Sequence, residues 1–155
     1  MRSTYIILDQ AFPADPFNDI LARNKTVLVT VTKDDGSTRG ERFGLVTPDE
    51  IFAMIDAKEE INLNRCFIKG FSLNKYRENK GLSSEDIVEL KDVYAVASWW
   101  EDVNKFNYAT FSGDADFHFA TFNGFAFFNS MVFSDVADFS DVTFGSTTYF
   151  TSTSF

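Results

Sequence analysis

Residues 111–143, FSGDADFHFAT FNGFAFFNSMV FSDVADFSDVT, decide the fold because they repeat every 11 residues. Large aromatic residues carry the repeat, in steps that alternate between six and five residues without a slip. The series is Trp100, Phe106, Phe111, Phe117, Phe122, Phe128, Phe133, Phe139, Phe144, Phe150 and Phe155. So regular a spacing indicates an internal repeat, and a repeat dictates the architecture of the chain.

Smaller side chains form a second column, two positions before each aromatic residue. They are Ser98, Asn104, Ala109, Ala115, Ala120, Ala126, Met131, Ala137, Val142, Thr148 and Thr153. Two inward positions separated by one polar residue are typical of a strand. We therefore predict a narrow coil in which large residues stack on large ones and small on small. A helical coil also has an 11-residue period, but the Ser, Thr, Asp, Asn, Gly and Phe of these repeats are poor helix formers.

The pattern Phe–(Ser/Asn)–x–x–(Ala/Val)–(Asp/Thr)–Phe resembles the pentapeptide-repeat proteins. Its alternation of five and six residues, as in SDVADFSDVTF (134–144), is similar to a variant of that repeat. The resemblance covers residues 61–155 and implies a mainly β fold, a right-handed quadrilateral β-helix. Sixteen repeat centres at four per coil predict about four coils, and the series from Phe106 to Phe150 is the predicted core stack.

The repeat extends upstream of Trp100, with one interruption. Residues 61–75, INLNRCFIKGFSLNK, read as three pentapeptides. Residues 76–87, YRENKGLSSEDI, break the register, and we expect them to form a protruding loop inserted into the solenoid. The predicted solenoid therefore spans 59–155 and includes this loop.

Residues 1–58 have a different pattern, typical of a small α/β region. The expected elements are strands at 4–8, 26–32 and 42–46, a short helix at 15–23 with Phe17, Ile20 and Leu21 on one face, and a helix from a Thr47 N-cap to about Lys58. A solenoid end exposes apolar side chains and unpaired backbone, so it needs a cover. We expect 1–58 to be this capping region. An independent domain is the alternative, but no flexible linker precedes Ile61.

Composition excludes several classes of protein. The chain has 155 residues, a net charge of −9 and a single cysteine. One cysteine excludes a disulfide framework, and the acidic balance argues against direct binding of nucleic acid or anionic membrane. The sequence shows no apolar run long enough for a membrane span and no signal-peptide pattern. We expect a cytoplasmic protein.

No set of residues with catalytic spacing emerges. His118, the only histidine, follows a repeat centre and is expected to be a solvated surface residue. Cys66 occupies an inward position, which predicts a buried and inert thiol. We therefore assign no catalytic, cofactor-binding or metal-binding residue, and expect no cofactor and no enzymatic activity.

Acidic residues without neighbouring cations gather late in the chain. They are Asp114, Asp116, Asp135, Asp138 and Asp141, and Asp116 and Asp138 are 22 residues apart, which stacks them on one side of successive coils. Three interpretations are open. The aspartates form a solvated face that keeps an aromatic rod soluble, an acidic recognition face that imitates DNA, or a calcium site.

Two groups of aromatic residues are candidates for contacts. Phe67, Trp99, Phe119, Phe125 and Phe127 lack an inward slot and form a candidate contact patch, unless the N-terminal region or the 76–87 loop covers some of them. Phe144, Tyr149, Phe150 and Phe155 lie on the last coil, which carries no charge, and are the predicted interface of a homo-oligomer. The alternative is that the chain is truncated inside a longer rod.

The leading hypothesis for function is a non-enzymatic scaffold, a protein–protein interaction module that self-associates through its C-terminal coil. The partner is then a second copy of the chain. The resemblance implies an alternative, an acidic DNA-mimic regulator that binds a type II topoisomerase such as gyrase.

Overall fold

The structure, a computed structural model, describes residues 2–154. The chain starts with β1 (Arg2–Leu8), a 3-10 turn (Pro16–Asn18), β2 (Thr26–Thr32), β3 (Thr38–Leu45) and α1 (Pro48–Ala57). Then come β4 (Ile61–Asn62), β5 (Cys66–Lys69), α2 (Leu73–Lys80), β6 (Val88–Leu90), β7 (Val93–Tyr94), β8 (Trp99–Glu101), β9 (Asn104–Lys105) and β10 (Ala109–Phe111). The last strands are β11 (Ala115–Asp116), β12 (Thr121–Asn123), β13 (Ala126–Phe127), β14 (Val132–Phe133), β15 (Ala137–Asp138), β16 (Thr143–Phe144) and β17 (Thr148–Tyr149).

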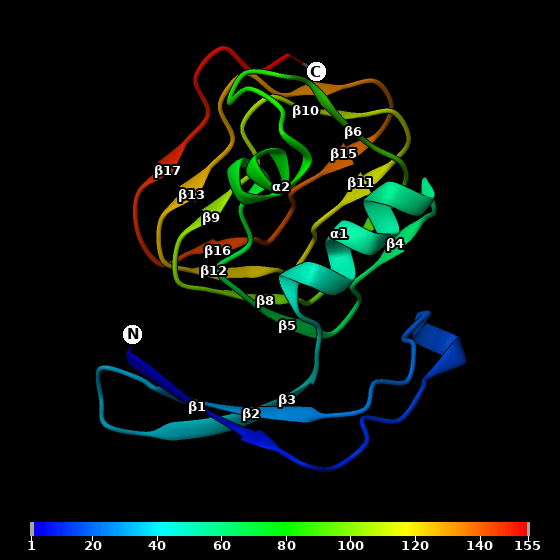
Figure 1. Cartoon of the computed structure of the whole chain (residues 1–155). Helices are drawn as coiled ribbons and strands as arrows, with labels where there is room; N and C mark the ends of the chain where they lie inside the picture. The colour runs from blue at the N-terminus through cyan, green and yellow to red at the C-terminus, as the bar shows by residue number, and fades with distance from the viewer. Residues whose placement is uncertain (1, 155) are drawn as a thin grey trace.

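The short strands form four sheets that the chain visits in a fixed order (Figure 1). The sheets run β1-β2-β3-β5-β8-β12-β16, β15-β11-β7-β4, β17-β13-β9 and β14-β10-β6. From β7 to β13 each strand pairs in parallel with the strand 22 residues later, as Thr121 does with Thr143. The offset between paired strands is thus twice the 11-residue period of the sequence. A mainly β fold of stacked parallel strands around an aromatic stack is confirmed, and it is compatible with a β-solenoid.

The aromatic column fills the centre of the ring of strands. Phe106, Phe111, Phe117, Phe122, Phe128 and Phe133 are all buried. The residue two positions before each of them is buried as well: Asn104, Ala109, Ala115, Ala120, Ala126 and Met131. The stack continues through Phe139, which is half-buried, but Phe144 and Phe150 are 37% and 42% exposed. Both residues therefore continue the predicted stack, but they lie at its open end. Each stacks on one ring, Phe122 or Phe128, at the end of the column.

The corners explain why steps of five and six alternate. One residue in the left-handed region occurs at every eleventh position, two places after a repeat centre: Ala97, Tyr108, Phe119, Ser130, Asp141 and Ser152. Each lies in a five-residue step. A single left-handed residue turns the chain tightly, which fits the shorter length of these corners. Among the six-residue steps, the one from Trp100 to Phe106 also has such a residue, Asp102.

The N-terminal strands cover one side of the ring rather than its end. β1, β2 and β3 form an antiparallel sheet, and β3 joins β5 in parallel through Gly44 and Cys66 (Figure 1). Val27, Val29, Val31 and Phe43 pack with Phe67 and Trp99 in a second core. Phe67 and Trp99 are each 1% exposed. They do not belong to an exposed contact patch, because the N-terminal sheet folds over them.

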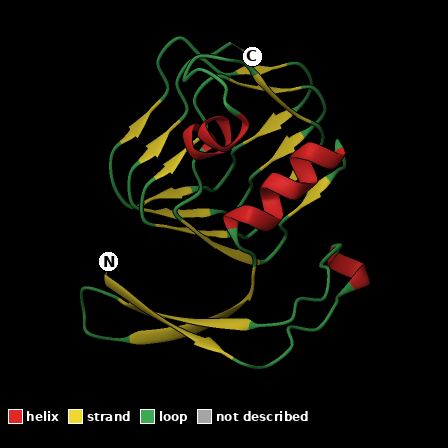
Figure 2. Ribbon diagram, in the orientation of Figure 1, coloured by secondary structure: helices red, strands yellow, loops and turns green. Residues whose placement is uncertain are grey.

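The two helices lie across the ring of strands (Figure 2). α1 starts with the predicted N-cap Thr47, which also forms a capping box by exchanging hydrogen bonds with Glu50. The helix buries Ile51, Phe52 and Ile55 against the main core. The predicted protruding loop at 76–87 is wrong in its first part. Residues 73–80 form α2. Its Arg77 is 1% exposed and donates hydrogen bonds to the carbonyl oxygens of Asp86 (2.7 Å), Tyr108 (3.1 Å) and Asn107.

The predicted helix at 15–23 is also wrong. Only Pro16–Asn18 form a 3-10 turn, because Asp19 adopts a left-handed conformation and ends it. The segment is instead a narrow hairpin, with bridges between Phe12 and Arg23 and between Asp15 and Ile20. Phe17, expected on an apolar helix face, is fully exposed.

Candidate functional site

A row of carboxylates follows the outer side of the sheet β15-β11-β7-β4. Asp116 in β11 pairs directly with Asp138 in β15, so the predicted stacking of these two residues is confirmed. Asp114 lies just before β11, where its backbone N–H donates to the side chain of Asp92 at 2.8 Å. Asp135 and Asp141 are exposed residues on either side of β15. The structure therefore brings together Asp116 and Asp138, but leaves the five aspartates without a common centre.

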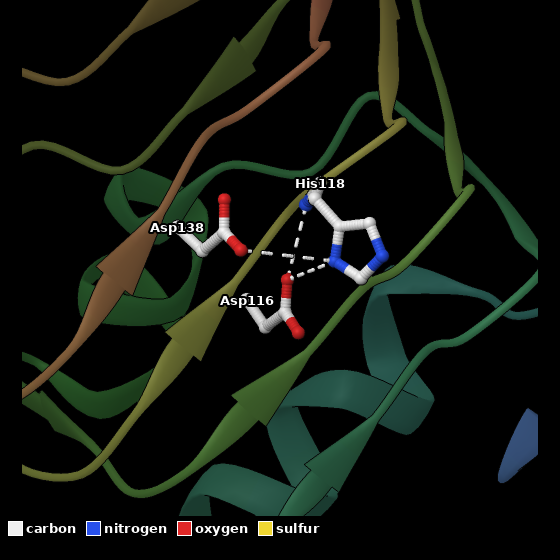
Figure 3. Close-up of side chains that lie close together, drawn as sticks. All are labelled: Asp116, His118 and Asp138. Atoms are coloured by element: carbon white, nitrogen blue, oxygen red, sulfur yellow. Dashed lines mark hydrogen bonds and ion pairs between the residues drawn. The ribbon is translucent and has the colours of Figure 1, made fainter.

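His118 joins this pair, contrary to the prediction of a solvated surface residue. Its Nδ1 lies 2.6 Å from Oδ1 of Asp116 and 4.0 Å from Oδ2 of Asp138 (Figure 3). The three side chains are between 28% and 41% exposed. His118 directly follows repeat centre Phe117, and its side chain turns back toward the carboxylate row. The 22-residue spacing in the sequence predicts that Asp116 and Asp138 are neighbours, but it does not predict which way the imidazole ring of His118 points.

The carboxylate of Asp138 has a fixed orientation. Its Oδ1 accepts hydrogen bonds from the side-chain hydroxyl of Ser140 at 2.6 Å and from the backbone N–H of Ser140 at 2.8 Å. These hydrogen bonds, followed by the charge of His118, lower the pKa of Asp138. The carboxylate is thus held in its charged form, with Oδ2 directed toward the imidazole (Figure 3).

A second candidate surface lies at the end of the aromatic column, on β15, β16 and β17. Phe144, Tyr149 and Phe150 are 37–42% exposed, and Val136 is 63% exposed. Tyr149 stacks on Phe127 with ring centroids 4.7 Å apart. We call Val136, Phe144, Tyr149 and Phe150 the end surface. Phe155, the fourth residue of the predicted interface, lies outside the described residues.

The candidate contact patch is reduced to three aromatic residues. Phe119 and Phe125 are 57% and 44% exposed, whereas Phe127 is half-buried between Tyr149 and Lys105. Phe119 is the left-handed residue of its corner, with φ of 60°. A bulky side chain is uncommon in that conformation. Phe119 thus combines a strained backbone conformation with an exposed phenyl ring.

The remaining candidates do not form a reactive site. Cys66 is buried, and burial raises the pKa of its thiol to about 11, so the expected inert thiol is consistent with its surroundings. A groove of about 190 Å³ lies between α1, α2 and β6. Its lining includes Ile55, Leu82 and Ile87 with a rim of Lys and Glu, and its described residues include no serine, histidine or cysteine.

Comparisons of this chain with protein-family models, curated proteins and solved structures found no match. The resemblance to pentapeptide repeats therefore depends on the residues themselves. Within residues 2–154, no helix has the length and apolar character needed to cross a bilayer.

Proposed function

We propose that this chain is a non-enzymatic interaction module that associates with a second copy through the end surface. Its fold is then a right-handed, quadrilateral pentapeptide-repeat solenoid of about four coils. Within the N-terminal region 1–58, α1 caps the first coil and β1, β2 and β3 cover one side, and the location is cytoplasmic. The proposal depends on the exposed rings of Phe144 in β16, Tyr149 in β17 and Phe150 directly after β17. They lie among strands that each pair on one side only. These strands are β15, β16 and β17, which end their sheets.

The backbone and side chains of the end surface favour a second copy of the chain as its binding partner. An open strand edge presents unpaired backbone groups, and aromatic rings beside it add apolar area. The end surface combines both. A two-fold contact would place one end surface against its own copy, so that rings stack on rings and strand edges lie against strand edges. The rings already stack in columns within the chain, as Phe128 does on Phe150 at 4.9 Å.

Analytical ultracentrifugation over micromolar to millimolar concentrations tests the proposal. The unchanged chain should form dimers, and Phe150→Ser should shift it to monomers because it removes a half-exposed ring from the end surface. Phe17→Ser is the matched control, since Phe17 is fully exposed on the N-terminal 3-10 turn and is not part of β15, β16 or β17. A monomeric parent protein, or an equal effect of both variants, would contradict the proposal.

A second candidate function is the imitation of DNA toward a topoisomerase. One observation favours it: Asp92, Asp114, Asp116 and Asp138 follow one sheet at the ~4.8 Å spacing of its strands. Residues 101–155 carry seven acidic residues and one lysine. A gyrase supercoiling assay decides this alternative, because a mimic should inhibit supercoiling, and an absence of any effect at molar excess removes it.

A further inference from the structure

Asp116, His118 and Asp138 form a cluster of possible metal ligands, none of which belongs to the end surface. One ligand atom each from Asp116, His118 and Asp138 lies within 4.8 Å of the others. Imidazole nitrogen with carboxylate oxygen is a donor set that first-row transition metals accept. We propose that these three residues bind one divalent first-row transition-metal ion, with Zn²⁺ as the representative.

The hydrogen bonding of the three side chains is incomplete without a cation. A single Nδ1–H can donate to only one carboxylate, and it serves Asp116 at 2.6 Å while Asp138 remains at 4.0 Å. Among the described residues, no lysine or arginine lies within ion-pair distance of either aspartate, and His118 is the only basic side chain there. Two carboxylates directly opposite in a sheet repel each other. A metal ion would accept one lone pair from each group and compensate both charges.

The distances fit such an ion after a small movement of the imidazole ring. Zinc ligands lie about 2.0–2.2 Å from the metal, which places neighbouring ligand atoms of a tetrahedral site ~3.4 Å apart. The two observed separations from Nδ1, 2.6 Å and 4.0 Å, lie on either side of this value. A shift of the ring away from Asp116 and toward Asp138 brings both separations close to it.

The backbone already holds the carboxylates in place. Asp116 and Asp138 are fixed by the pairing of β11 with β15, and the two hydrogen bonds from Ser140 orient Asp138. Such outer contacts raise metal affinity because they lower the cost of ordering the ligands. Ser140 is thus a positioning residue of the site.

The donor set also predicts selectivity. Ca²⁺ takes six to eight oxygen ligands, whereas this site supplies one nitrogen and two carboxylates. The partial exposure of the three side chains leaves room for water in the remaining coordination positions. We expect Zn²⁺ and Co²⁺ to bind more tightly than Ca²⁺, with a stoichiometry of one ion per chain.

Calorimetric titration of the EDTA-treated protein with ZnCl₂ tests the site, with CaCl₂ as the comparison ion. His118→Gln and Asp138→Asn should each weaken Zn²⁺ binding at least about 10-fold, and Ser140→Ala should weaken it by a smaller factor. Asp135→Asn is the matched control, because it removes the same charge from an exposed position beside β15. The d–d absorption of added Co²⁺ should report nitrogen and oxygen ligands and should disappear in His118→Gln.

Either of two kinds of result would overturn the proposal. One is the absence of Zn²⁺ binding by the unchanged chain. The other is an equal loss in Asp135→Asn and Asp138→Asn, or equal affinity for Ca²⁺ and Zn²⁺, which would show a diffuse attraction to acidic surface. Far-UV circular dichroism confirms that each variant is folded before titration, so a loss of binding is assigned to the ligands.

Discussion

The indole ring of Trp100 and the phenyl ring of Phe122 stack with centroids 5.5 Å apart and planes 13° apart. Their strands, β8 and β12, pair in register at a spacing of 22 residues. The same register places Phe144 on the other face of Phe122, again at 5.5 Å. Phe122 is therefore enclosed by aromatic rings on both faces, whereas Phe144 is 37% exposed at the end of the column.

This difference predicts unequal costs of truncation along one column. Phe122→Ala should lower the free energy of unfolding by about 3–5 kcal/mol, because it leaves a cavity inside a closed stack. Phe144→Ala should cost about 1–2 kcal/mol, since its ring is partly hydrated already. Urea denaturation of the two variants measures both values. Equal costs would contradict the description of Phe144 as an open end.

The left-handed corners predict a variant that tolerates the loss of an aromatic ring. Phe119→Gly should leave stability unchanged or raise it by up to about 1 kcal/mol, because glycine adopts positive φ without the penalty of a Cβ. Phe125→Gly is the control, since its φ is not positive and glycine there adds only chain entropy, at a cost of about 0.5–1 kcal/mol. Thermal unfolding of the pair checks the expectation. A strong destabilisation by Phe119→Gly would mean that its ring packs on the fold.

The repeat could be predicted from the sequence because its large and small side chains recur at regular spacing. Each strand of the aromatic column pairs with the equivalent strand of a later repeat in the same chain. One spacing therefore predicts the register, the stacking of Phe111 on Phe133 and the pairing of Asp116 with Asp138.

Non-periodic contacts could not be predicted in this way. The cover over Trp99 depends on the pairing of β3 with β5, which joins a non-repeating strand to the first repeats. The direction of His118 depends on a corner conformation, and α2 depends on an arginine with carbonyl partners distant in the sequence.

Arg77 anchors α2 to the ring of strands through hydrogen bonds. Its buried guanidinium group donates to three backbone carbonyls, and no carboxylate is within ion-pair distance among the described residues. Arg77→Met keeps the apolar stem but leaves those carbonyls unsatisfied, at about 1–3 kcal/mol for each group that water cannot reach. We expect a loss of about 2–4 kcal/mol by urea denaturation, and a smaller loss in Arg77→Lys. Equal stability of the parent and Arg77→Met would contradict this role.

Tyr76 and Asp56 connect α2 to α1 and make a pH-dependent prediction. The hydroxyl of Tyr76 donates to Oδ1 of Asp56 at 2.7 Å, while Nζ of Lys80 lies 2.8 Å from Oδ2. Burial, together with the hydrogen bond to Asp56, raises the pKa of Tyr76 from 10.0 to about 12. Absorbance at the phenolate band, with Tyr76→Phe subtracted from the parent, should show this titration. Asp56→Asn should move it lower, but not fully back, because burial is the larger cause.

The same pair affects stability at high pH, and the sign follows from the raised pKa. Below pH 10 the phenol is protonated in both states and its contribution is fully present. Between pH 10 and about 12 the unfolded chain loses this proton first, so the free energy of unfolding falls as pH rises. Tyr76→Phe has no proton to lose and should show a shallower decline than the parent over this range. Parallel declines would mean that the phenol titrates alike in the folded and unfolded chains, which would contradict its hydrogen bond to Asp56.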